Sequence, residues 1–154
     1  MEALLYVAMN EPPQFNIEEV RWEEACAQLR AIRREVFVVE QHVPEALEWD
    51  GIDGDCAHVL ARSADGSPIG TGRLLPDGHI GRMAVLKAWR RRGVGSALLT
   101  RLMELARRRG LREVALNAQT YAIPFYAGHG FRAVGEEFME AGIPHRAMVL
   151  SLTA

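Results

Sequence analysis

Residues 84–99, AVLKAWRRRGVGSALL, place three arginines directly before a Gly-Val-Gly turn and an apolar helical pattern. The first N–H groups of a helix lack intrahelical partners and carry partial positive charge, so they suit an anion such as a pyrophosphate. Gly93 and Gly95 lack a Cβ and would let that anion approach the backbone. The pattern is neither GxGxxG, because Leu98 stands at the third glycine, nor a P-loop. From these local features alone, a plain tight turn followed by a solvated charge run is an equally good interpretation.

A second stretch of interest is NAQTYAIPFYAGHGF, residues 117–131. A strand ending in Asn117 and Gln119 leads into a short helix that carries Phe125 and Tyr126. A phenol held at such a position can donate a proton to a leaving group. From local features alone, a core aromatic residue is the simpler interpretation of Tyr126.

These stretches together resemble a known enzyme family. MAVLKAWRRRGVGSALL is similar to motif A of the GNAT N-acetyltransferases, a [QR]xxGxG pattern that Arg90, Gly93 and Gly95 fill, and FYAGHGF resembles the FYxxxGF element of that family. REVFVVEQ (34–41), NAQ (117–119) and AGIPH (141–145) resemble its small bacterial ElaA/YjcF-like branch. The resemblance covers residues 16–152 and implies an N-acetyltransferase.

The resemblance implies acetyl-CoA as the co-substrate and no metal. The backbone of residues 83–85 would pair with the pantetheine, as a neighbouring strand would. An N–H near Val85 would hold the thioester carbonyl, and the turn from Arg91 to Ser96 would hold the pyrophosphate. The residues expected to bind the cofactor are Met83, Ala84, Val85, Arg90, Arg91, Arg92, Gly93, Val94, Gly95, Ser96, Asn117 and Tyr126.

The implied reaction is direct attack of an amine on the thioester through a tetrahedral intermediate. A thiol has a pKa of about 8.5 and a phenol of about 10, so Tyr126 can protonate the departing CoA thiolate as the general acid. Tyr121 is the rival phenol. The general base stays open among Glu35, Glu40, His145 and a chain of waters.

The helix and loop after residue 30 are expected to shape the acceptor site in this fold. Arg33 (or Arg34), Glu40, Gln41 and His145 are the expected substrate-binding residues, although an ion pair at a helix end explains the charged ones equally well. The acceptor is expected to be an amine of a small molecule, with a peptide amine as the broader case. The alternative function is a GNAT module that senses acyl-CoA without turnover.

Composition narrows the partners of the chain. It has 154 residues and a net charge of −2, which argues against a nucleic-acid binder. Cys26 and Cys56 form no CxxC pair and no signal peptide or apolar span is visible, so we expect a cytoplasmic protein that does not contact a membrane. DGIDGDCAH (50–58) holds acidic, thiol and imidazole groups, but its spacing fits no metal motif and a turn-rich loop is expected. A homodimer stays open.

Hydrophobic periodicity and turn residues predict the elements that position these groups. Strands are expected at 15–20, 57–63, 69–75, 79–86, 112–119, 131–137 and 145–152; helices at 22–40, 93–109 and 122–130; and a loop over 41–55. This order predicts an α/β domain around one sheet. The resemblance specifies the GNAT fold, with a mixed, mostly antiparallel sheet, flanking helices and a splay between strands 4 and 5. Residues 1–14 are expected to be an N-terminal extension and 15–154 a single domain.

Overall fold

The first half of the chain forms an antiparallel sheet. The structure is a computed structural model that describes residues 14–153. The sheet has the order β1-β2-β3-β4, comprising β1 (Phe15–Val20), β2 (Ala57–Ser63), β3 (Pro68–Leu74) and β4 (Ile80–Val85). The turn between β2 and β3 contains Gly66, whose φ of 88° explains why glycine stands there. Each strand pairs with its sequence neighbour: short turns join β2 to β3 and β3 to β4, whereas the helical segment 21–56 connects β1 to β2.

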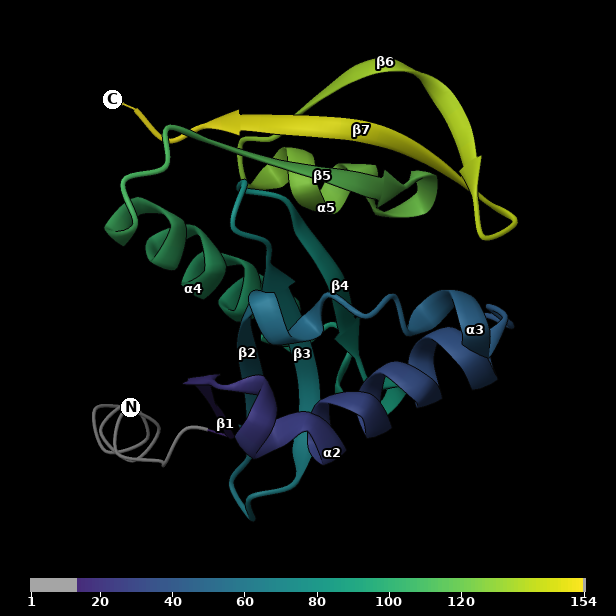
Figure 1. Ribbon diagram of the computed structural model, residues 1–154, viewed down its shortest axis with the longest axis vertical. Coiled ribbons are helices and arrows are strands. Elements are labelled where there is room, and N and C mark those ends of the chain that lie inside the picture. Colours follow the sequence, from purple (N-terminus) through teal and green to yellow (C-terminus); the bar gives the residue numbers. More distant parts are fainter. Residues whose placement is uncertain (1–13, 154) are drawn as a thin grey trace, which may run out of the picture.

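The last third of the chain forms a second sheet, of order β5-β7-β6 (Figure 1). Its strands are β5 (Glu113–Gln119), β6 (Arg132–Glu140) and β7 (Ile143–Ser151). The β6–β7 hairpin extends closer to its turn than the sequence indicated, because Gly142 and Ala141 adopt positive φ values that allow a tight reversal. Glu140 and Ile143 therefore belong to the strands and not to a loop.

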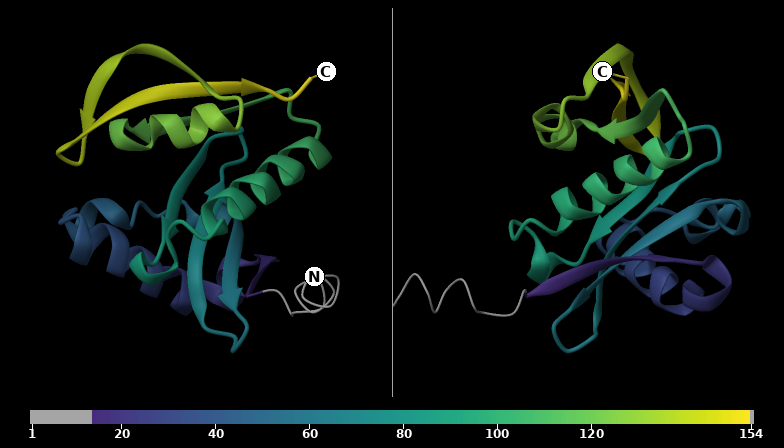
Figure 2. Two further views of the ribbon diagram at one scale, coloured as in Figure 1. Left: turned by 180° about the vertical axis from the view of Figure 1, so that it is seen from behind. Right: turned by 90° about the vertical axis from the view of Figure 1, so that its left-hand side faces the viewer.

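The two sheets meet at one end and diverge at the other. A parallel bridge pairs His79 with Ala115, and the Ala115 N–H donates to the Gly78 carbonyl at 3.1 Å. Beyond this point β4 and β5 separate (Figure 2, right). The predicted splay between the fourth and fifth strands is therefore confirmed.

Helices flank these sheets. They are α2 (Trp22–Arg33), α3 (Glu45–Glu48), α4 (Val94–Arg108) and α5 (Ile123–Gly128), with the short turns η2 (Asp53–Asp55), η3 (Lys87–Trp89) and η4 (Thr120–Ala122). The helix predicted over 22–40 is α-helical only to Arg33 and continues as the π-helix η1 (Arg34–Glu40), whose wider turn is marked by the Gln41 N–H donating to the Val36 carbonyl at 3.1 Å. The loop predicted over 41–55 contains α3 and η2, so that part of the prediction is wrong.

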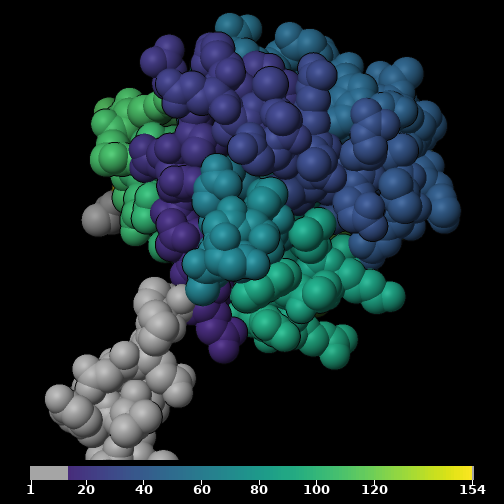
Figure 3. Space-filling view, turned by 90° about the horizontal axis from the view of Figure 1, so that it is seen from below, coloured from purple at the N-terminus to yellow at the C-terminus, as the bar shows by residue number. Residues whose placement is uncertain are grey.

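The main core lies between α4 and both sheets. The helix buries Leu98, Leu99 and Leu102 completely, against Val59 of β2 and Leu116 of β5. A second cluster packs α2 and η1 against β2 and β4. Figure 3 shows α2 and β1 over the end of the molecule opposite the second sheet. Residues 1–13, most of the predicted extension, lie outside the described residues. Within the described residues 14–153, no helix is long and apolar enough to span a bilayer.

Candidate active site

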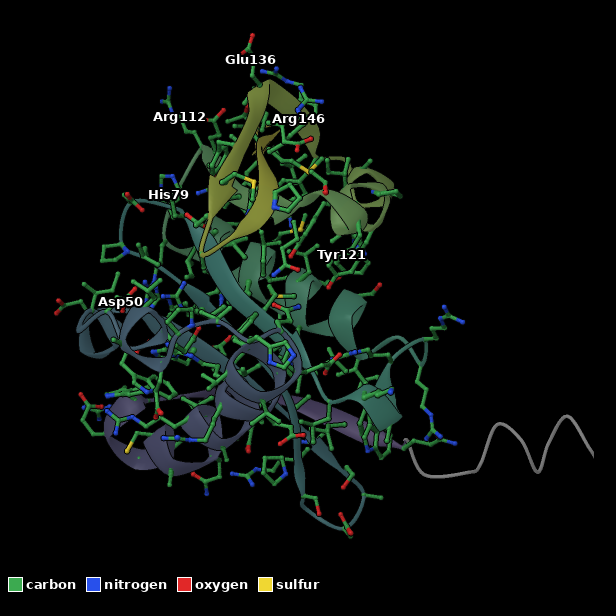
Figure 4. The ribbon with its side chains drawn as sticks, turned by 90° about the vertical axis from the view of Figure 1, so that its right-hand side faces the viewer. Asp50, His79, Arg112, Tyr121, Glu136 and Arg146 are labelled. Carbon is green, nitrogen blue, oxygen red and sulfur yellow. The ribbon has the colours of Figure 1, made fainter. Side chains whose placement is uncertain are left out.

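A cleft of about 1110 Å³ occupies the splay between the sheets. Its walls come from the end of β4, the first turn of α4, the end of β5, η4, α5 and the β6–β7 hairpin. In Figure 4, Tyr121 and Asp50 mark different walls of this region, while Glu136 and Arg146 lie at the outer end of the second sheet, away from it. The size and the mixed polar and apolar lining suit an extended ligand.

The end of β4 presents a free backbone edge to this cleft. The Leu86 N–H donates to the Ile69 carbonyl at 2.9 Å, and Val85 is paired with Gly70 in the same register. Hydrogen-bonding direction alternates along an antiparallel strand, so the N–H and C=O of Val85 point away from β3, toward the splay. Arg90 Nε donates to that carbonyl at 3.0 Å. The Val85 N–H therefore points toward the side where β5 does not pair with β4.

A bulge in β4 precedes that edge. The register between β3 and β4 shifts between Thr71 and Arg73, and Arg82 has a φ of 50°. A non-glycine residue with a positive φ is uncommon, and here it coincides with a bend in the strand. Met83, Ala84 and Val85 all line the cleft beyond the bend.

The helix α4 begins at the glycine turn expected from the sequence. Gly93 has a φ of 85° and Arg91 a φ of 62°, so two left-handed residues turn the chain into the helix. The first helical bond is the Ala97 N–H to the Gly93 carbonyl at 3.1 Å, which leaves the N–H groups of residues 94–96 as the unpaired donors at the helix start. Gly93, Val94, Gly95 and Ser96 line the cleft.

The three arginines before this turn have different surroundings. Glu40 accepts from both terminal nitrogens of Arg90, at 2.5 and 2.6 Å, so the whole Arg90 guanidinium is bound within the protein. Arg91 is exposed and lines the cleft. Arg92 stacks on Trp89 with 4.9 Å between the guanidinium carbon and the ring centre. Arg91 thus has the guanidinium best placed to reach a phosphate.

Tyr126 lies on α5 between two aromatic rings. Phe125 and Phe131 contact it edge-on, with ring centres 5.0 and 5.9 Å away. Burial, with a smaller contribution from Tyr121, raises the pKa of the Tyr126 phenol to about 12. The phenol therefore stays protonated at neutral pH, as a proton donor must. Tyr121 also lines the cleft, but its side chain is 76% exposed.

The acceptor-side residues predicted from the sequence separate into two groups. Gln41 and His145 line the cleft, as does Asn117, which is predicted to bind the cofactor, and Gln41 exchanges side-chain hydrogen bonds of 2.9 and 3.3 Å with Gln119. Glu40 is held by Arg90, whose hydrogen bond lowers the pKa of the Glu40 carboxyl. The exposed pair between Arg34 and Glu45, 2.6 Å long, likewise occupies Arg34.

Arg33 does not reach the cleft, contrary to the sequence-based expectation. It is 1% exposed and donates to Glu48 at 2.8 Å and to Asp53 at 2.7 Å. A buried guanidinium requires paired carboxylates, and the segment after η1 folds back to supply them. Arg33 is therefore a structural ion-pair residue.

The acidic segment 50–58 is an arginine-binding network. Asp53 bridges Arg33 and Arg73, and Asp50 accepts from Arg73 at 2.5 Å. The Asp53 carbonyl binds the His58 ring at 2.9 Å. These contacts give the segment a structural role.

The sequence analysis did not identify the charged residues of this network that line the cleft. Arg73 and Arg82 line the cleft together with Glu48, and Arg82 lies 3.0 Å from that carboxylate. The available signal was the presence of single arginines inside two otherwise apolar strands, IGTGRLL and HIGRMAVL. A charge in a buried strand needs partners, and here they come from α3 and the segment after it.

Comparisons with known proteins agree with this geometry. Residues 13–152 match a family model described as Acetyltransferase (GNAT) domain. The N-acetyltransferase YjcF of Bacillus subtilis, described as uncharacterized, is 40% identical over 131 residues, which cover 82% of this chain and 93% of that protein.

Two solved structures share both fold and sequence. Escherichia coli ElaA has a TM-score of 0.78 and 31% identity, over 87% of this chain and 98% of ElaA. An acyl-CoA N-acyltransferase from Pseudomonas aeruginosa has a TM-score of 0.73 and 36% identity, over 88% and 97% of the two chains. The chain therefore belongs to the GNAT family of acetyltransferases, in the small bacterial branch that includes YjcF and ElaA.

Proposed function

We propose that this enzyme transfers an acetyl group from acetyl-CoA to the amine of a small molecule, with Tyr126 as the general acid. The observation that carries the proposal is the convergence on one cleft of three donors: the free N–H groups at the start of α4, the outward N–H of Val85 and the partly buried Tyr126 phenol. A diphosphate, a thioester carbonyl and a departing sulfur need donors of these kinds.

The cleft fits an acetyl-CoA molecule by the character of its walls. Gly95 faces it without a side chain, and a Cβ built there would lie 3.5 Å from the Phe125 ring, at ordinary contact distance. Ser96 adds a hydroxyl, whose Oγ lies 3.1 Å from His129 Nε2. The diphosphate would bind residues 91–96, and the pantetheine would extend along residues 83–85 and Asn117.

In this mechanism the amine attacks the thioester carbon, and the Val85 N–H stabilises the oxyanion that forms. The C–S bond then breaks, and the Tyr126 O–H protonates the thiolate. The high pKa of Tyr126 keeps the proton available at neutral pH. The phenolate that results is reprotonated from solvent or from the group that received the amine proton.

The test is Tyr126→Phe, with Tyr121→Phe as the matched control. We expect Tyr126→Phe to lower kcat by about 10²-fold or more while the Kd for CoA, measured by calorimetry, changes less than about twofold. Tyr121→Phe should retain turnover. Equal loss of CoA binding and turnover in Tyr126→Phe would make Tyr126 a structural residue.

A non-catalytic acyl-CoA sensor is the alternative. It predicts CoA binding without thiol release for any amine in a broad panel of amines and polyamines. Calorimetry also tests the proposed domain organisation. A chain that starts at residue 15 should bind CoA with the Kd of the full chain. Cytoplasmic location and a homodimer remain predictions, to be checked by fractionation and by sedimentation.

A further inference from the structure

A cluster of polar side chains lines the cleft from the second sheet. His145 pairs with Gln119 of β5 and with Phe138 of β6, and Glu140 pairs with Ile143. Directly paired residues, and residues two apart on one strand, share a face of a sheet. His145, Glu140 and Asn117 all line the cleft, whereas Arg146, the neighbour of His145, lies at the outer end of the sheet (Figure 4).

The backbone fixes which nitrogen of His145 carries the proton. Nδ1 lies 2.7 Å from the Ile143 carbonyl, which can only accept a hydrogen bond. Nδ1 must therefore be the donor, and in the neutral imidazole Nε2 keeps its lone pair. The ring stacks on Phe138 at 5.9 Å between centres and 22° between planes, and the residue is only 6% exposed, so its orientation is fixed.

A carboxylate lies beside the lone-pair nitrogen. Glu140 Oε2 is 3.6 Å from His145 Nε2. In the neutral imidazole both atoms only accept, so no hydrogen bond joins them, but the carboxylate is close enough to stabilise an imidazolium. Asn117 Nδ2 approaches the other oxygen of Glu140 at 3.5 Å. A proton accepted at His145 Nε2 would therefore lie next to the Glu140 carboxylate, its counter-ion.

The other carboxylates considered as bases are occupied or lie elsewhere. Glu40 is bound by Arg90, and Glu35 is exposed and does not line the cleft. Glu48 pairs with Arg33 and Arg82, and Asp50 pairs with Arg73. His145 has no such cation against it among the described contacts.

We infer that His145 is the general base of the reaction, accepting the amine proton at Nε2 with Glu140 as the counter-ion of the resulting imidazolium. This inference rests on the proposed acetyl transfer. As the amine attacks, its nitrogen bonds to the thioester carbon and becomes cationic; one N–H bond then breaks and the proton bonds to Nε2. The C–S bond breaks, Tyr126 protonates the sulfur, and the His145 proton restores the phenol through solvent, so starting from the neutral amine no net proton is gained or lost; an amine that arrives as its ammonium ion first releases one proton to solvent.

Several titratable groups face the cleft around His145 and enter its pH dependence. Glu140 approaches from β6, Tyr121 from η4 and Tyr126 from α5. The other titratable or charged groups that line the cleft are His79, Glu48, Asp50, Arg73, Arg82, Arg90 and Arg91. Glu140 is the one charged group whose contact with the ring is among the described ion pairs. Its carboxylate stabilises the imidazolium that forms when the base takes a proton.

The main experiment compares His145→Gln with His79→Gln across pH, using an amine that the wild type acetylates. His79 lines the same cleft but is half-exposed and paired with Asp77 at 3.0 Å, so His79→Gln controls for the loss of a cleft imidazole that is not the proposed base. We expect His145→Gln to lower kcat about 10²- to 10⁴-fold and to remove the acidic limb of the kcat/KM profile, with the Kd for CoA within about twofold. His79→Gln should keep the wild-type profile. A retained acidic limb with less than about threefold loss in His145→Gln overturns the assignment.

Two measurements keep the inference testable if His145→Gln does not fold. In Glu140→Gln the imidazolium loses its counter-ion, so the acidic limb should move to lower pH; an unmoved limb contradicts the inference. In the wild type, ¹⁵N spectra of the His145 ring above pH 8 should show a protonated Nδ1 and a bare Nε2. The opposite tautomer also overturns it.

Failure of the proposed function has a separate signature. If the wild type binds no CoA, or binds it and releases no thiol with any amine, the acetyl transfer itself is wrong. If the wild type turns over and only the His145 results fail, the transfer stands and another group takes the proton.

Discussion

At the scale of single residues, the charged side chains that line the cleft show how ion pairs stabilise charges in a protein interior. Arg73 is 4% exposed and binds Asp50 and Asp53, and Arg82 adds a further cation next to Asp50. Burial alone would raise the pKa of the Asp50 carboxyl, but the hydrogen bond and charge of Arg73 outweigh it and lower that pKa to about 2. The carboxylate is therefore charged at every pH at which the enzyme would work.

This shift predicts a pH-dependent contribution to stability. Because the folded pKa lies below the unfolded value of 3.8, folding favours the deprotonated form. The contribution is complete above about pH 4 and is lost as the pH falls toward 2. Asp50→Asn should therefore lower the free energy of unfolding by about 1–2 kcal/mol at pH 7, and the difference should shrink below pH 4.

Urea titrations at pH 7 and at pH 3 measure that difference. Asp55→Asn is the control, since Asp55 is exposed in the same segment, and its effect should stay within about 0.5 kcal/mol. An Asp50→Asn deficit that is the same at both pH values would exclude the ion pair as its cause.

At the scale of elements, the conformation of a few residues positions the site. The start of α4 requires a left-handed residue at Gly93, where a Cβ would meet no atom within 4 Å. Gly95 has an ordinary helical conformation and room for a methyl group. The two glycines of the motif thus differ in kind: one is needed for backbone geometry, and the other keeps the cleft wall open.

Alanine substitutions separate these roles. Gly93→Ala should destabilise the protein by about 1 kcal/mol through backbone strain, because the side chain itself meets no obstacle. Gly95→Ala should leave stability unchanged or raise it by up to about 1 kcal/mol, since alanine favours the helix. Urea denaturation of both variants measures the contrast. Equal losses would mean that packing, and not backbone conformation, decides both positions.

Element boundaries also show what the sequence could predict. Apolar spacing located α4, which buries one periodic face against the core, and apolar runs bounded by turn residues located the strands, although β6 buries none of its residues. The same spacing could not reveal that the helix widens at Arg34, since π- and α-helices bury nearly the same residues. Nor could it show that Arg33 turns to Glu48 and Asp53, because that ion pair depends on how the segment after the helix folds back.

The site was predictable to the extent that its chemistry lies in local motifs. The glycine turn and Tyr126 stand in contiguous stretches that resemble family elements, and the structure brings both to one cleft. The pairing of Arg90 with Glu40 joins residues fifty positions apart, and the contact of His145 with Glu140 depends on a register shift in β6 between Val134 and Phe138. Long-range pairings of this kind leave no periodic signal in a single sequence.

At the scale of the whole molecule, the enzyme consists of two sheets that share a core on one side and separate on the other. The core cluster joins β2 and β3 of the first sheet to β5 and β7 of the second through α4. At the opposite edge, β4 and β5 lack each other as partners beyond the His79–Ala115 bridge. A bound pantetheine would fill this position and hydrogen-bond to both edges, as an added strand does.

Hydrogen exchange with two ligands tests that arrangement. CoA should slow amide exchange both in residues 83–85 of β4 and in residues 94–96 of α4, because it supplies partners to the open strand edge and to the helix start. Adenosine diphosphate carries the diphosphate without the pantetheine, so it should protect the α4 turn and leave β4 unchanged. Amides of β1, which lies at the far edge of the first sheet, serve as the internal reference. If both ligands protected β4 equally, the strand edge would respond to the helix and not to the pantetheine, and the splay would not be the binding position for that arm of the co-substrate.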